Sequence, residues 1–205
     1  MDSNLKNAAL ELIYKTCWNA SAEQYERCIA VSDVIEVPKG INIVKQGEIQ
    51  DVIYFLVDGI IRGVSYGIDG KVLTDCIMYE TGAAIYAGVS LTNPIPATDY
   101  VNTVTKCTFV TLPRNVLNAI LEEDMNLNRM YVRCVENVLE DYRMLEVIRS
   151  KKSVKRYSWF CERHPKMVGV LPKECILSYL DISEEAYRQA LALQRQQNTE
   201  KDAQS

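Results

Sequence analysis

The sequence predicts an α+β fold in which antiparallel strands form a sandwich or barrel and helices follow. The first observation is a series of four glycines, Gly40, Gly47, Gly59 and Gly70, with short apolar runs between them. Strands about ten residues apart, separated by turn signals, are typical of a sandwich or barrel, and glycine supplies the positive φ that such turns need. The second observation is a change to helical periodicity after Pro113.

Two helices are expected before the strands. The first spans about residues 5–15 and carries four apolar residues on one face, namely Leu5, Ala9, Leu12 and Ile13. The second begins after Ser21, which is a preferred N-cap residue, and ends near Val31.

Strands are expected from Val34 to about Leu112. β-branched and aromatic residues favour strands over 34–37, 41–44, 52–57, 60–64, 98–104 and 108–112. Asp69-Gly70, with strand residues on both sides, predicts a β-hairpin.

A long helix follows, with apolar residues in steps of 4, 3, 4, 7 and 3. They form a heptad seam of Leu127, Tyr131, Cys134, Val138, Leu145 and Ile148. A helix of this kind needs a partner along its length. That partner is either its own domain or a second copy of the chain, and we favour a homodimer because few other helices are near in the sequence.

Shorter helices are expected in the C-terminal part. One spans Val154–Arg163, and another lies within Leu171–Leu180. After a tight turn at Asp181-Ile182, a last helix starts with Ser183 as N-cap, and the polar tail 196–205 is expected to fray. We therefore divide the chain into residues 1–112, 113–150 and 151–205.

Composition restricts the class of protein. The net charge of −4 conceals a basic C-terminal region, since residues 149–205 hold 11 Lys and Arg against 7 Asp and Glu. Such a region can bind DNA although the rest of the chain is acidic. The longest apolar runs are too short to span a membrane, and the N-terminus lacks signal-peptide features, so we expect a cytoplasmic protein.

Seven cysteines are present, no two closer than eleven residues. No paired metal or redox motif is therefore expected, and free thiols that pack as small apolar residues are favoured over a redox switch. The single histidine, His164, has no partners for a catalytic triad and is interpreted as a cation at a helix end. With no phosphate loop or hydrolase motif either, we expect no enzyme activity, no metal and no cofactor.

The chain resembles the Crp/Fnr family of bacterial transcription regulators in two regions. Pro38-Lys-Gly40, Gly47-Glu48, Asp51–Arg62 and Asp69-Gly70-Lys71 resemble its cyclic-nucleotide-binding β-roll, and Leu171–Leu191 resembles its helix-turn-helix. The resemblance implies a β-roll, a long dimerisation helix and a DNA-binding domain in that order.

The resemblance also implies an effector pocket, made here by Gly82, Ala83, Ala84, Tyr86, Ala97 and Thr98. Relatives follow the glycine with a Glu that binds ribose, and later carry an Arg that pairs with the cyclic phosphate. Ala83 and Ala97 stand near those positions, and no Lys or Arg occurs from Val72 to Thr105. We expect a small-molecule effector other than cyclic AMP, or a pocket that is a structural remnant.

The helix-turn-helix residues expected to contact DNA are Lys173, Ser183, Glu185, Tyr187, Arg188 and Gln189. The family often has Glu, two residues, then Ser-Arg, whereas Arg188-Gln189 occupies the last two positions here. Glu, Arg and Gln can each read a base edge, and the basic segment Arg149–Arg156 with Lys173 attracts phosphates. The resemblance therefore implies a homodimeric regulator that binds a palindromic DNA site. The alternative is a sensor or protein-interaction module that no longer binds DNA.

Overall fold

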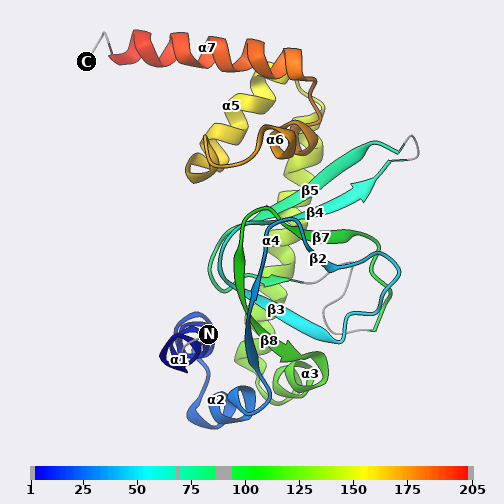
Figure 1. The fold of residues 1–205 in the computed structure, drawn as a ribbon, viewed down its shortest axis with the longest axis vertical. Helices are drawn as coiled ribbons and strands as arrows, with labels where there is room; N and C mark the ends of the chain where they lie inside the picture. Colours follow the sequence, from blue (N-terminus) through cyan, green and yellow to red (C-terminus); the bar gives the residue numbers. More distant parts are fainter. Residues whose placement is uncertain (1–2, 68–69, 86–93, 203–205) are drawn as a thin grey trace. The chain divides into compact units, whose positions relative to one another are not determined.

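The computed structural model describes residues 3–67, 70–85 and 94–202, and it confirms the α+β class (Figure 1). The chain forms two compact units. The roll unit contains Met1–Ser65 and Cys76–Val135, and the helical unit contains Tyr66–Asp75 and Glu136–Ser205. These units do not follow the expected boundaries at 112 and 150, because the end of a hairpin joins the C-terminal helices and the long helix contributes to both units.

Two helical segments precede the strands. Helix α1 (Ser3–Glu11) continues into a π-helix (Leu12–Cys17), where a single α-helix was expected. Within the π-helix, Tyr14 is fully buried and its hydroxyl lies 2.6 Å from Ser32 Oγ. Helix α2 (Ala22–Ile29) begins as predicted at Ser21, whose side chain and backbone exchange hydrogen bonds with Gln24 in a capping box.

The described strands form two four-stranded sheets. The strands are β1 (Asp33–Val37), β2 (Asn42–Val44), β3 (Val52–Asp58), β4 (Ile61–Tyr66), β5 (Val72–Met78), β6 (Ala84–Ile85), β7 (Tyr100–Thr103) and β8 (Cys107–Pro113). One sheet has the order β1-β8-β3-β6 and the other the order β2-β7-β4-β5. The pairings of β8 with β1 and β3, of β3 with β6, and of β7 with β2 and β4 are antiparallel. The short strand β6 was not expected from the sequence.

Strand β3 joins two apolar clusters in the roll unit. Ile53 and Phe55 pack with the N-terminal helices and α3, whereas Leu56 packs inside the roll with Val44, Val101 and Phe109. Alternate residues of a strand point to opposite faces, and burial on both faces explains why β3 is apolar along most of its length.

The four glycines of the predicted series adopt the predicted conformation. Their φ angles are +84° at Gly40, +83° at Gly47, +112° at Gly59 and +77° at Gly70. The hairpin is also present, because β4 and β5 are neighbours in their sheet and Gly67 N donates to the Lys71 carbonyl over 2.8 Å. Asp69, the other residue of the predicted turn, lies outside the described residues.

The remaining helices are α3 (Arg114–Glu123), α4 (Met125–Arg149), α5 (Ser153–Arg163), α6 (Lys173–Leu180) and α7 (Glu184–Asp202), with a 3₁₀ turn at Pro165–Met167. Asp124 begins α4, because its carboxylate accepts from the N–H groups of Asn126 and Leu127. A hydrogen bond from Gln24 and these two N–H groups lower the pKa of Asp124. Helix α7 continues through Asp202, where a frayed tail from residue 196 was expected.

All seven cysteines are free. Burial raises the pKa of Cys28 to about 11 and also raises the pKa of Cys17 and Cys107, which disfavours the reactive thiolate at these three positions. Among the described residues, no group of three or more His, Cys, Asp or Glu side chains could hold a metal. The described helices also include none that is long and apolar enough to cross a bilayer.

Candidate functional site

Helices α6 and α7 form a helix-turn-helix in the helical unit (Figure 1). The turn depends on Asp181, which adopts the left-handed conformation with φ of 51° and ψ of 56°. Asp tolerates this region better than most residues, and the following N–H of Ile182 donates to the Leu177 carbonyl over 3.1 Å. Ser183 then starts α7, because its Oγ accepts from the N–H of Ala186. The predicted turn and N-cap are confirmed.

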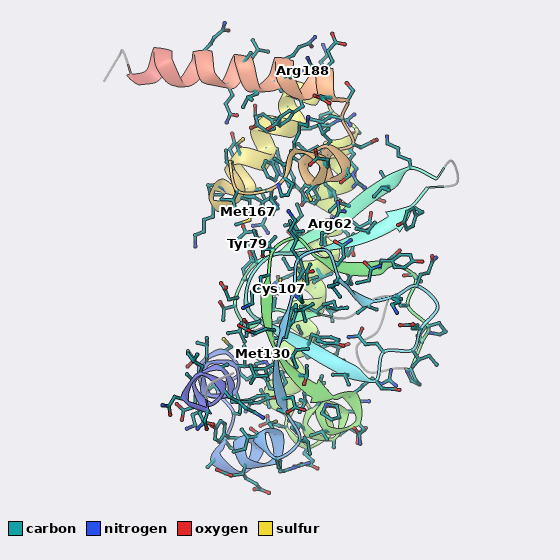
Figure 2. All side chains as sticks on the ribbon, in the orientation of Figure 1. Arg62, Tyr79, Cys107, Met130, Met167 and Arg188 are labelled. Atoms are coloured by element: carbon teal, nitrogen blue, oxygen red, sulfur yellow. The ribbon has the colours of Figure 1, made fainter. Side chains whose placement is uncertain are left out.

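The first two turns of α7 present polar side chains to solvent. Glu185, Arg188 and Gln189 are exposed, and the side chain of Arg188, labelled in Figure 2, is 71% exposed. Gln189 Nε2 donates to Glu185 Oε1 over 3.4 Å. This face can therefore offer one donor-rich guanidinium, one amide and one carboxylate to a ligand.

Two of the expected contact residues have other partners. Tyr187 packs its ring edge-to-face on Tyr157, with 5.1 Å between ring centroids, and so anchors α7 to α5. Lys173 forms an ion pair with Glu184 over 2.9 Å, and this contact lowers the pKa of Glu184. The acidic start of α7 thus neutralises the lysine that was expected to attract phosphates.

The basic segment after α4 contributes both to structure and to surface charge. Arg149 Nε donates to the carbonyl of Tyr179 over 3.1 Å, and Arg156 Nη1 donates to the carbonyls of Leu180 and Asp181 over 3.1 and 2.6 Å. These carbonyls lie at the C-terminus of α6, where helical acceptors lack partners within the helix. The two arginines therefore cap the first helix of the motif, whereas Lys151, Lys152 and Lys155 are exposed and keep their charge at the surface.

His164 lies at the C-terminus of α5, as expected from the sequence, and it is buried there. It is 7% exposed, and its Nε2 lies 3.2 Å from the Tyr179 hydroxyl. Its ring also contacts those of Trp159 and Phe160. His164 is thus also a member of the aromatic core between α5 and α6, which the sequence did not indicate.

The expected effector segment follows β5 in the chain and runs beside β3. Gly82 has φ of +87°, its N–H donates to the Leu56 carbonyl over 2.8 Å, and a side chain there would meet Cys17 Sγ at 2.8 Å. Ala83 accepts from the N–H of Leu56, and Ala84 pairs with Phe55. Tyr86 lies outside the described residues.

Ala97 lies inside the apolar cluster of the roll. It is 4% exposed, belongs to the cluster that contains Leu56 and Phe109, and Ala83 packs against that cluster. Thr98 is exposed and donates to the Asp99 carboxylate over 2.7 Å. The structure therefore places Ala83 and Ala97 around one apolar interior and leaves Thr98 at the surface.

Two of the six residues of the expected dimer seam on α4 are buried within their own chain. Leu127 and Leu145 are 7% and 2% exposed, so both are already buried by their own chain. Of the remaining seam residues, Tyr131, Val138 and Ile148 are half-buried and Cys134 is exposed. A second stripe, also spaced by heptads, is open to solvent: Met125, Val132 and Leu139, with Tyr142 one turn further on.

Comparisons with known proteins identify the architecture. No protein-family model matches this chain, and no curated protein matches it. Among solved structures, a transcriptional regulator of the Crp/Fnr family from Eubacterium rectale superposes with a TM-score of 0.68 at 13% identity, over 89% of this chain and 87% of that one. FixK2 from Bradyrhizobium japonicum gives 0.67 at 15% identity, over 82% of this chain and 86% of that one.

The chain has a Crp/Fnr-like fold. A third neighbour, the c-di-GMP responsive global regulator CLP from Xanthomonas campestris, superposes with a TM-score of 0.61 at 13% identity over 87% of this chain and 93% of that one. At such low identities, the superpositions establish the fold alone. Any function must be argued from the residues of the present chain. The Crp/Fnr-like resemblance seen in the sequence is thus confirmed at the level of architecture.

Sequence reasoning missed the two capping arginines in this Crp/Fnr-like fold. Arg149 and Arg156 were counted as phosphate-attracting charges, yet both donate to backbone carbonyls of the helix-turn-helix. A charged run gives no sign of which members will meet unpaired carbonyls more than twenty residues away. The sequence distinguished these two residues from the other charged residues of the segment only in that they are arginines and the others are lysines. The planar guanidinium donates to paired acceptors better than a lysine ammonium does.

Proposed function

We propose that this chain is a homodimeric, DNA-binding transcription regulator of the Crp/Fnr type. The observation that carries the proposal is the helix-turn-helix itself, in which a capped α6, a left-handed turn and an N-capped α7 present Arg188 and Gln189 to solvent. In such a motif the second helix enters the major groove with its N-terminal residues at the base edges.

The exposed side chains of α7 provide a base-reading set. Arg188 matches guanine O6 and N7, Gln189 matches adenine, and Glu185 accepts from cytosine N4. Lys151, Lys152 and Lys155, all exposed, supply phosphate contacts that do not depend on sequence. Two copies would place two recognition helices on half-sites of a palindrome about one helical turn apart.

For the second copy, the supporting feature is the open stripe on α4. Met125, Val132 and Leu139 are 64%, 46% and 63% exposed and repeat every seven residues. These residues supply one of the two apolar positions per heptad of a two-helix coiled coil along a 25-residue helix, and Tyr142, three residues after Leu139, supplies one residue of the other position. We place the dimer contact on this stripe and away from Leu127 and Leu145.

The effector is a small molecule without a phosphate. The roll interior around Ala83 and Ala97 is apolar, and Asp99 is the charged side chain beside Thr98. A cyclic phosphate needs a charge-assisted donor, and no Lys or Arg stands between Val72 and Thr105.

A mobility shift on the DNA upstream of the chain's own gene, at two salt concentrations, tests the proposal. Wild type should shift the DNA at low salt and lose affinity as salt rises. Arg188→Ala should weaken specific binding by about tenfold or more. Arg188→Lys should keep the salt-dependent electrostatic attraction to DNA but lose discrimination between bases. Lys106→Ala in the roll is the matched control, since it removes one positive charge far from α7 in the sequence and should leave binding unchanged.

A sensor or interaction module without DNA binding is the second candidate. The observation that favours it is the acidic start of α7, where Glu184 and Glu185 repel phosphates and Glu184 neutralises Lys173. Under this alternative neither wild type nor any variant shifts DNA at low salt, and a protein partner is recovered instead. That pattern would refute the regulator.

A further inference from the structure

The end of the β4–β5 hairpin belongs to the same compact unit as the helix-turn-helix. Tyr66–Asp75 cluster with the C-terminal helices, although the rest of both strands belongs to the roll unit. Two side chains on β5 or just before it contact the motif. Lys71 Nζ donates to the Asp181 carboxylate, and Thr74 Oγ1 lies 2.6 Å from Ser178 Oγ.

Arg149 joins the hairpin to the same part of the motif. Its Nη2 donates to the Thr74 carbonyl over 2.8 Å, and its Nε donates to the Tyr179 carbonyl over 3.1 Å. Asp75 lies 3.8 Å from the guanidinium, and the side chains of Arg149 and Asp75 are 19% and 20% exposed. These contacts are partly shielded from water and so are stronger than exposed ones.

These contacts converge on Asp181, the residue that forms the turn between α6 and α7. Asp181 has the unfavourable positive φ, its carboxylate pairs with Lys71, and its carbonyl accepts from Arg156. The ion pair with Lys71, with Arg149 and Arg156 nearby, lowers the pKa of Asp181. Thr74 is fully buried, so its hydroxyl and that of Ser178 satisfy each other away from water.

We propose that Lys71, Thr74 and Arg149 form a hairpin clamp that fixes the helix-turn-helix turn through Ser178 and Asp181, and that regulation acts through this clamp. The regulatory part rests on the proposed function. Strands β4 and β5 continue covalently from the clamp into the roll, through residues 61–65 and 76–78. An effector that shifts these strands in the roll would therefore act on the turn between α6 and α7. It would alter DNA affinity if the held and released turns bind DNA unequally.

Hydrogen exchange on the full chain tests the clamp without any ligand. The amide of Ile182, which closes the turn on Leu177, is the reporter. Lys71→Gln and Thr74→Val should each make it exchange about threefold to tenfold faster, as expected when one partly exposed ion pair or one buried hydroxyl contact is lost. Lys106→Gln is the matched control, because Lys106 forms a similar ion pair with Glu36 in the roll unit, at 2.8 Å.

Unchanged exchange at Ile182 in both folded clamp variants would overturn the clamp, as would equal acceleration in Lys106→Gln. Far-ultraviolet circular dichroism checks that each variant is folded. In Lys71→Arg, which keeps the charge, the Ile182 amide should exchange more slowly than in Lys71→Gln.

A second experiment measures DNA affinity by mobility shift, where Lys71→Gln and Thr74→Val should bind more weakly than Lys106→Gln. If wild type binds no DNA but hydrogen exchange at Ile182 responds as expected, the proposed DNA-binding function is refuted and the proposed clamp is supported. If wild type binds DNA and the variants bind equally well, regulation through the clamp is refuted.

Discussion

Gly59 combines two constraints at a single residue. Its φ is +112°, and a Cβ there would lie 2.6 Å from Cys107 Sγ and 2.7 Å from the carbonyl oxygen of Lys106. Gly40 has φ of +84° but no atom within 4 Å of an added Cβ. The same residue type thus serves a turn alone at Gly40, and a turn with a close backbone approach at Gly59.

Alanine at the two positions should separate these effects. Gly40→Ala should lower the free energy of unfolding by about 1 kcal/mol, since only the left-handed conformation is penalised. Gly59→Ala should cost about 3 kcal/mol or more, because the β-carbon also collides with backbone atoms that cannot move freely. Urea unfolding of both variants measures the difference, and equal losses would contradict the close approach at Gly59.

At the scale of a single element, α4 shows why a heptad pattern is ambiguous. The helix carries apolar residues in two heptad registers, one through Leu127 and Leu145 and one through Met125, Val132 and Leu139. Both satisfy the same spacing rule. The structure buries Leu127 and Leu145 of the first register and exposes Met125, Val132 and Leu139 of the second.

A charge in the exposed register should therefore disrupt the proposed dimer. Leu139→Glu should raise the dimer dissociation constant by about a hundredfold or more, since it puts two carboxylates at a desolvated seam. Met144→Glu is the control, because Met144 is also exposed on α4 but lies outside this stripe. Sedimentation equilibrium gives both constants. Dimers of unchanged stability in Leu139→Glu would place the second copy elsewhere.

At the scale of the whole molecule, the chain has a Crp/Fnr-like fold, while no Lys or Arg stands between Val72 and Thr105 to pair with a cyclic phosphate there. Eight strands are described, and the cluster inside the roll is apolar around Ala97. A fold is maintained by burial of apolar residues, whereas a ligand is recognised by a few polar groups. The polar groups that recognise a ligand can therefore be lost while the apolar residues that maintain the fold are preserved.

Cyclic AMP should consequently leave thermal unfolding unchanged. A ligand that binds only the native state raises stability according to its concentration and affinity, so about 1 mM cyclic AMP should shift the melting temperature by less than about 1 °C. Differential scanning fluorimetry measures this, with a cyclic-AMP-binding protein as positive control. A rise of several degrees would show that the roll binds the cyclic phosphate without an arginine in its expected place.

Much of the architecture follows from short-range rules. Ser21 and Ser183 cap their helices, the roll glycines take positive φ, and Asp181 makes the turn, because each of these features depends on hydrogen bonds or sterics within a few residues. The order of strands and helices follows from periodicity for the same reason.

Contacts between distant residues account for the rest. Lys71 meets Asp181 across 110 positions, Arg149 meets Thr74 across 75, and His164 meets Tyr179 across 15. No local pattern indicates which carbonyls lack a partner, which face of α4 is covered, or which unit takes the end of a hairpin. Those features depend on desolvation and on pairing of groups brought together only by folding. They explain why Arg149 and Arg156, expected from the sequence to attract phosphates, donate to carbonyls of the helix-turn-helix, and why His164 packs in the aromatic core beside it.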